Sequence, residues 1–154
     1  MNNNMKIKEK KQPVLTAAGI LAVALGLILV YFGFFMLMES NTAIGPQMTK
    51  TERSITRCLA IAGIYLMANG VCNGIGGFFG AVNSGSEEYV KKVTKYGWIL
   101  LGFSVCNVIL LSILTDIIGN RFNMLILLVP IAISVMYCVG AFFNVRLVKR
   151  KCGE

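Results

Sequence analysis

The chain contains no histidine among its 154 residues, and only seven of its side chains are carboxylates. Histidine is the commonest general base and metal ligand, so most metal sites and many catalytic sites lack their usual parts here. Its five cysteines form no C-x-x-C pair, and no serine motif carries an obvious base. We therefore expect a protein that is not an enzyme and that holds no metal and no cofactor.

Charged residues are also scarce, at 14% of the chain against roughly 25% in ordinary globular domains. They are absent from four long windows, residues 12–38, 58–86, 96–115 and 122–145. Each window is long enough to cross a hydrocarbon core roughly 30 Å thick at 1.5 Å per helical residue. Long continuous apolar runs are not typical of barrel strands, which alternate. The sequence predicts an all-α integral membrane protein with four transmembrane helices.

The predicted organisation is one transmembrane domain between two short basic tails. We expect the domain over residues 13–147, a disordered tail over 1–12 and a second tail over 148–154. The four spans are expected at about 13–38, 55–82, 95–118 and 122–146. The tight third connection, GNRF, favours an antiparallel hairpin of the last two spans, and we expect one antiparallel bundle.

Lysine and arginine are distributed unevenly between the two sides of this predicted bundle. Eleven lie in the tails and in the connection between the second and third spans, against four in the other two connections. The positive-inside rule then places both termini in the cytoplasm, in a plasma or inner membrane. The net charge of +8 follows mostly from this topology. No DNA-reading motif accompanies it, so a nucleic-acid partner is not expected.

Two S/T-x-x-E sequences are candidate helix starts. Thr49 and Glu52 form a possible capping box before the second span, and Ser84 and Glu87 form one before the third. The first box places Arg53 and Arg57 on one face of an amphipathic entry turn. Such a face is either a solvated flank or a contact for anionic headgroups or for a partner.

Small residues recur at four-residue intervals within two spans. They are Ala18, Ala22 and Gly26 in the first span, and the pairs Gly70 with Gly74 and Gly76 with Gly80 in the second. Such stripes allow close approach of neighbouring helices in lipid. We expect these residues to pack against other helices or against another copy of the chain.

Polar residues lie at similar depth in three of the spans. The cluster consists of Asn69, Asn73, Ser104, Asn107, Ser134 and Tyr137. An amide in hydrocarbon needs hydrogen-bond partners, so these side chains are expected to point into the bundle. Two interpretations remain open. The asparagines are either interhelical contacts, each worth about 0.6 kcal/mol on average, or the lining of a small polar cavity.

The segment NTAIGPQMTKTERSITRCLAIAGI, residues 41–64, resembles the loop-to-helix junction of small bacterial membrane proteins related to killing-peptide immunity proteins. In that group, a glycine-containing turn and a T/S-x-x-E stretch lead into a basic helix start. The resemblance implies a small bacterial membrane protein and carries over no functional residue.

Two functions follow as hypotheses. The first is a non-enzymatic accessory, regulatory or immunity-type protein that acts through helix contacts, with the lipid bilayer around it and a second copy or a larger membrane protein as partner. The alternative is a small oligomeric transporter or channel, with Asn69, Asn73 and Asn107 lining a midplane cavity.

Overall fold

Four helices make up almost all of the part of the chain that the structure, a computed structural model, describes: residues 12–43, 45, 48–118 and 124–152. The helices are α1 (Pro13–Ala43), α2 (Lys50–Val82), α3 (Val90–Ile118) and α4 (Met124–Cys152). All four are long and apolar enough to cross a membrane. The prediction of an all-helical protein is confirmed, and its four helices have the length and composition that membrane spans require.

The start of α2 lies where its capping sequence predicts. The hydroxyl oxygen of Thr49 accepts a hydrogen bond from the Glu52 amide at 3.2 Å, and the Glu52 carboxylate accepts one from the Thr49 amide at 2.8 Å. The box therefore satisfies two amides that the helix leaves without partners. Lys50 is the first residue of α2, so the capping box at Thr49 is confirmed.

The capping box predicted at Ser84 and Glu87 is wrong. Helix α3 begins only at Val90, and Ser84 lies in the turn before it. Its hydroxyl donates to the Ala81 carbonyl at 3.2 Å and lies 2.7 Å from the hydroxyl of Thr16 on α1. Gly85, with a φ of 91°, then turns the chain in the left-handed region that favours glycine. A contact with another helix thus replaces the local cap.

Each of the four helices extends beyond its charge-free window at one end or at both. Helix α1 continues past Met38 to Ala43, and α4 continues to Cys152, so most of the segment expected as a second tail, 148–154, is helical. Lysine and arginine are good helix formers, which explains why a basic end does not stop α4. The N-terminal tail expected over 1–12 lies outside the described residues except for Gln12.

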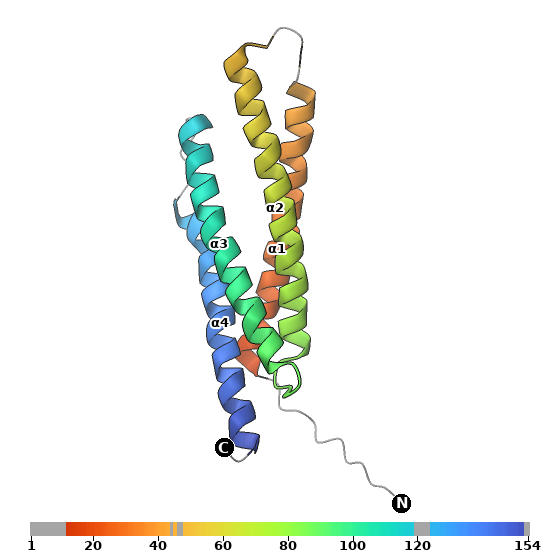
Figure 1. Cartoon of the computed structure of the whole chain (residues 1–154), viewed down its shortest axis with the longest axis vertical. Helices are drawn as coiled ribbons and strands as arrows, with labels where there is room; N and C mark the ends of the chain where they lie inside the picture. Colours follow the sequence, from red (N-terminus) through yellow and green to blue (C-terminus); the bar gives the residue numbers. More distant parts are fainter. Residues whose placement is uncertain (1–11, 44, 46–47, 119–123, 153–154) are drawn as a thin grey trace, which may run out of the picture.

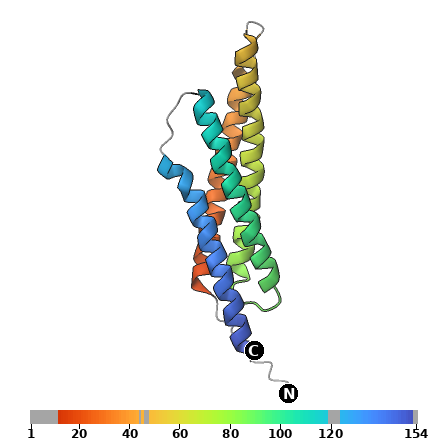
Figure 2. The ribbon, with the colours of Figure 1, turned by 60° about the vertical axis from the view of Figure 1, so that its left-hand side comes forward.

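Helices α1 and α2 lie side by side over most of their length, and α3 and α4 lie alongside them (Figure 1). The beginning of α1 and the end of α4 are at the same end of the molecule. At the other end, α2 reaches further than the neighbouring ends of α3 and α4, as both views show (Figure 2). The contact between α1 and α2 is the most extensive in the molecule.

Glycine faces glycine along this contact. A Cβ atom added at Gly26 would lie 2.5 Å from the Gly70 carbonyl oxygen, and one added at Gly70 would lie 2.5 Å from that of Gly26. The same reciprocal contact joins two other pairs, Gly19 with Gly77 and Gly33 with Gly63. The partner numbers fall along α2 as they rise along α1, so the two helices run in opposite directions. We call these six residues the glycine seam; its members recur every seven residues.

The small residues predicted to pack have different positions relative to this seam. Gly26 and Gly70 belong to it, while Ala18 and Ala22 lie in a buried cluster with residues of α3 and α4. The remaining three are Gly74, with open space at its Cβ position, Gly76, next to Leu100 of α3, and Gly80, next to Tyr137 of α4. Helix α2 therefore presents small residues to α1 on one face and to α3 and α4 on another.

We predict opposite effects for two alanine substitutions one helical turn apart. Gly70→Ala places a methyl group against the backbone of Gly26, and we expect a loss of about 1–3 kcal/mol in the free energy of unfolding. Gly74→Ala meets no atom within 4 Å and removes a poor helix former, so we expect no loss or a gain of about 0.5–1 kcal/mol. Reversible unfolding in mixed micelles measures both values; equal effects would contradict the seam.

Candidate functional site

All six polar residues predicted at midplane depth are buried in the bundle. Asn69, Asn73 and Asn107 are at most 1% exposed, and the other three, Ser104, Ser134 and Tyr137, are no more exposed than that. They come from three helices, α2, α3 and α4. A group of hydroxyls and amides thus occupies positions that large apolar side chains fill in a water-soluble protein. We call these six residues the polar layer.

Within α2, the two asparagines are hydrogen-bonded to each other. The Asn73 side-chain amide donates to the Asn69 side-chain oxygen at 2.7 Å and lies 3.0 Å from the Asn69 carbonyl oxygen. The four-residue separation places both on one helix face, as the sequence indicates. The Asn69 Nδ2 and the Asn73 Oδ1 have no partner. Two of the four polar side-chain atoms of this pair are therefore hydrogen-bonded, and the other two are not.

Two serines join α3 to α4. The hydroxyl oxygens of Ser104 and Ser134 are 2.6 Å apart, and they lie 2.9 and 3.3 Å from the Leu100 carbonyl oxygen. Each hydroxyl can donate once, so one proton can bridge the serines while the other bonds the carbonyl. The result is a closed polar contact between the two helices.

Tyr137 joins α4 to α2. Its hydroxyl donates to the Gly76 carbonyl at 2.8 Å, and its side chain is fully buried. The ring fits because two glycines leave room for it: a Cβ atom at Gly80 would overlap the ring, and one at Gly97 of α3 would lie 3.2 Å from it. Glycines of α2 and α3 thus form a slot for one phenol side chain of α4.

Asn107 differs from the rest of the polar layer. Its side chain is 1% exposed, and neither its amide nitrogen nor its oxygen has a hydrogen-bond partner. An unsatisfied buried polar group costs about 1–3 kcal/mol. The structure thus brings Asn69 to Asn73 and Ser104 to Ser134, but it forms no hydrogen bond from Asn107 to either asparagine.

Among the buried polar residues outside the predicted cluster, Asn144 joins two distant parts of the chain. Asn144 of α4 is fully buried, and its side-chain oxygen accepts a hydrogen bond from the Gly85 amide at 2.7 Å. It ties the turn between α2 and α3 to α4. In the sequence, Asn144 lies at the end of the last charge-free window, two residues before Arg146, so the pattern does not mark it as an interior residue. Only the pairing with a turn 59 residues away gives it a structural role.

The chemistry open to the polar layer is neutral hydrogen bonding, because its side chains are amides and hydroxyls. In the part of the chain that the structure describes, no three histidine, cysteine or carboxylate side chains come together as metal ligands. Four of the cysteines, Cys58, Cys72, Cys106 and Cys138, are free thiols. The arrangement can hold helices in register, and around Asn107 it can accept a further polar group.

Comparison of the chain with protein-family models, with curated proteins and with solved structures finds no match.

We predict different effects for two leucine substitutions in the polar layer. Leucine has the same number of side-chain heavy atoms as asparagine and the same branching. Asn73→Leu removes the bond to Asn69, so we expect the free energy of unfolding to fall by about 1 kcal/mol. Asn107→Leu removes two unpaired atoms, so we expect no loss or a small gain. Unfolding in mixed micelles tests both; a large loss at Asn107 would show that its amide has a partner in the native protein.

Proposed function

We propose that the chain is a small non-enzymatic membrane protein that acts through helix contacts, with a larger membrane protein or a second copy as its partner. The observation that carries this proposal is the set of direct hydrogen bonds within the polar layer. Ser104 bonds to Ser134, Tyr137 to Gly76 and Asn73 to Asn69. The serine bond and the Tyr137 bond join different helices, and the asparagine bond lies within α2; the groups used in these bonds are not free to bind a passing solute. An accessory, regulatory or immunity-type role agrees with this arrangement.

The outward face supports the same proposal. Large apolar side chains on every helix are more than half exposed, among them Leu27, Tyr31, Phe78, Trp98, Ile109 and Phe142. In a bilayer, lipid and neighbouring membrane proteins cover such a surface. With the interior occupied by its own contacts, the surface is where a protein of this size can bind another.

A small transporter or channel is the second candidate. One observation favours it: Asn107, Asn69 and Asn73 together leave two amide nitrogens and two amide oxygens unpaired and buried. These atoms could bind a small polar solute or water. The direct bonds through the serines and Tyr137 weigh against a continuous polar path, so we rank this function second.

For the membrane topology, we propose an antiparallel bundle in the plasma or inner membrane, with both termini in the cytoplasm. Eleven lysines and arginines lie on the side of the termini and four on the other. This asymmetry supports the orientation through the positive-inside rule.

The orientation predicts which thiols an impermeant reagent can reach. In a variant that keeps only Cys152, we expect a membrane-impermeant maleimide to label inverted vesicles but not intact cells. A cysteine-free variant carrying Thr51→Cys, at the opposite end of the bundle, is the matched control and should label intact cells. Labelling of Cys152 from outside would contradict the proposed topology.

The two functional candidates differ in the ion and solute flux that they predict. For the helix-contact protein, we expect proteoliposomes to release potassium, protons and a small polar dye no faster than protein-free vesicles. We expect a photo-crosslinking residue, introduced separately at Leu27, Ile75 or Ile109, to give a discrete protein adduct in native membranes only where its face of the bundle contacts the partner. A flux well above background that Asn107→Leu abolishes would reject this proposal and favour the transporter.

A further inference from the structure

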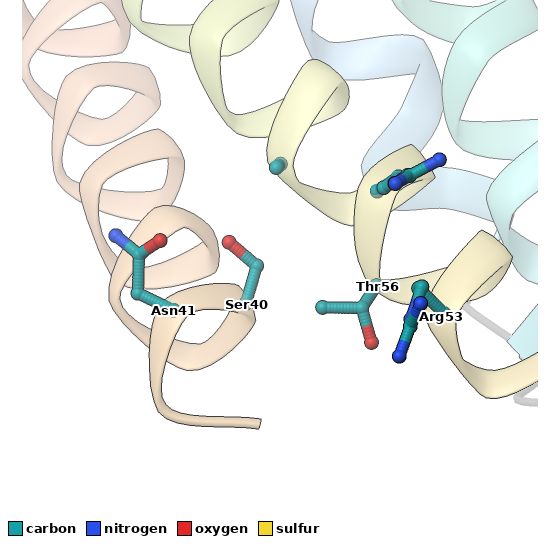
Figure 3. Close-up of a pocket in the computed structure, with 6 residues that line it drawn as sticks. Ser40, Asn41, Arg53 and Thr56 are labelled. Atoms are coloured by element: carbon teal, nitrogen blue, oxygen red, sulfur yellow. The ribbon is translucent and has the colours of Figure 1, made fainter. Parts of the chain in front are cut away.

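A cavity opens between the end of α1 and the start of α2. Its volume is about 270 Å³, and its lining consists of Ser40, Asn41, Arg53, Thr56, Arg57 and Ala60. The close-up shows Ser40 and Asn41 on α1 opposite Thr56 and Arg53 on α2 (Figure 3). This is the end of the molecule at which α2 projects beyond α3 and α4.

The cavity continues the glycine seam. Ser40 stands seven residues after Gly33, and Thr56 stands seven residues before Gly63, so both hold the next seam positions. Both are buried, at 2% and 6% exposed. A side chain at a seam position prevents the close backbone contact that two glycines allow. Replacing one glycine pair by Ser40 and Thr56 therefore separates the helices where the cavity lies.

The hydroxyls of these two residues are held in place by their own helices. The Ser40 hydroxyl donates to the Leu37 carbonyl at 2.8 Å, and the Thr56 hydroxyl donates to the Glu52 carbonyl at 2.9 Å. They form neutral, fixed walls. The donors that remain for a ligand are the side-chain amide of Asn41 and the guanidinium groups of Arg53 and Arg57.

The charge of the two arginines is not neutralised within the part of the chain that the structure describes. Neither guanidinium has a carboxylate partner there. Glu52 lies one residue away, but its carboxylate binds the amide and hydroxyl of Thr49, both at 2.8 Å. Glu39 is exposed and does not line the cavity. Two arginines one turn apart on one helix face thus present an unpaired charge of two at the cavity.

The cavity also lies at a boundary of composition. Arg57 is the last charged residue before the charge-free window that begins at Cys58, and Ala60 lies inside that window. The cavity thus spans the transition from the polar end of α2 to its apolar part. In a bilayer, this transition corresponds to the depth of the headgroup phosphates.

We propose that this cavity binds a phosphate group, carried either by an anionic phospholipid or by a soluble phosphate compound. Arginine presents planar donors that match phosphate oxygens in pairs, and two arginines supply enough donors for such contacts. The Asn41 amide adds a donor at the rim, and the small side chain of Ala60 leaves space beneath. This phosphate site does not depend on the contacts with a partner protein proposed above.

The test is a binding titration of the full chain in a non-ionic detergent, followed by native mass spectrometry. The probes are phosphatidylglycerol, phosphatidylcholine and inorganic phosphate. We expect the double variant Arg53→Gln with Arg57→Gln to weaken binding of phosphatidylglycerol or of inorganic phosphate about tenfold or more, because it loses charge-assisted hydrogen bonds. Lys91→Gln with Lys149→Gln removes the same charge at exposed positions elsewhere and should change binding less than twofold.

A third variant separates shape from charge. Ala60→Leu keeps both arginines but fills the cavity, so we expect it to weaken binding as well. Equal weakening by the arginine and lysine variants would overturn the proposal, since it would show bulk electrostatic attraction. Undiminished binding in the arginine variant would also overturn it. If the arginine variant loses binding of phosphatidylglycerol alone, the phosphate belongs to a lipid. If it loses binding of inorganic phosphate, the phosphate belongs to a soluble compound.

Discussion

The backbone contact between α1 and α2 is the constraint on which the rest of the structure depends. Three glycine pairs bring the two helices so close that a single added carbon would overlap a carbonyl oxygen. This contact fixes the rotation and register of α2. One face of α2 is then used by Gly63, Gly70 and Gly77, and the adjacent face turns Asn69 and Asn73 into the bundle. The polar layer and the outer cavity both follow from that rotation.

The distribution of residue sizes follows the physics of a bilayer. Lipid chains are as apolar as leucine, so burying leucine between helices gains little, and association depends on close packing and hydrogen bonds. The interior holds glycine, alanine, serine and asparagine beside leucines such as Leu15, Leu66 and Leu100, while many phenylalanines and isoleucines and the tryptophan face outward. Tyr137 is the largest of the fully buried side chains, and its hydroxyl has a carbonyl partner on α2. Its slot between Gly80 and Gly97 exists because both positions lack a side chain.

Much of this structure could be predicted from local sequence. Charge-free windows indicate the four helices, and the Thr49–Glu52 box indicates the first residue of α2, because both signals depend on residues close together in the chain. Seam glycines such as Gly19 and Gly63 could not be identified in this way, since a search at four-residue spacing misses a seven-residue repeat shared by two helices. Ser84 and Asn144 take partners on distant elements, which local patterns do not contain. The cavity at Ser40 and Thr56 requires the register of the seam.

The glycine seam also has a consequence for the order of assembly in the membrane. Its partners belong to consecutive helices, so the closing loop is short and the entropy lost on pairing is small. The pair needs nothing from α3 or α4 to form its backbone contact. It can therefore form once the second helix has left the ribosome, while the other two are still being synthesised. Helices α3 and α4 then join a template that already presents Gly76 and Gly80 to Leu100 and Tyr137.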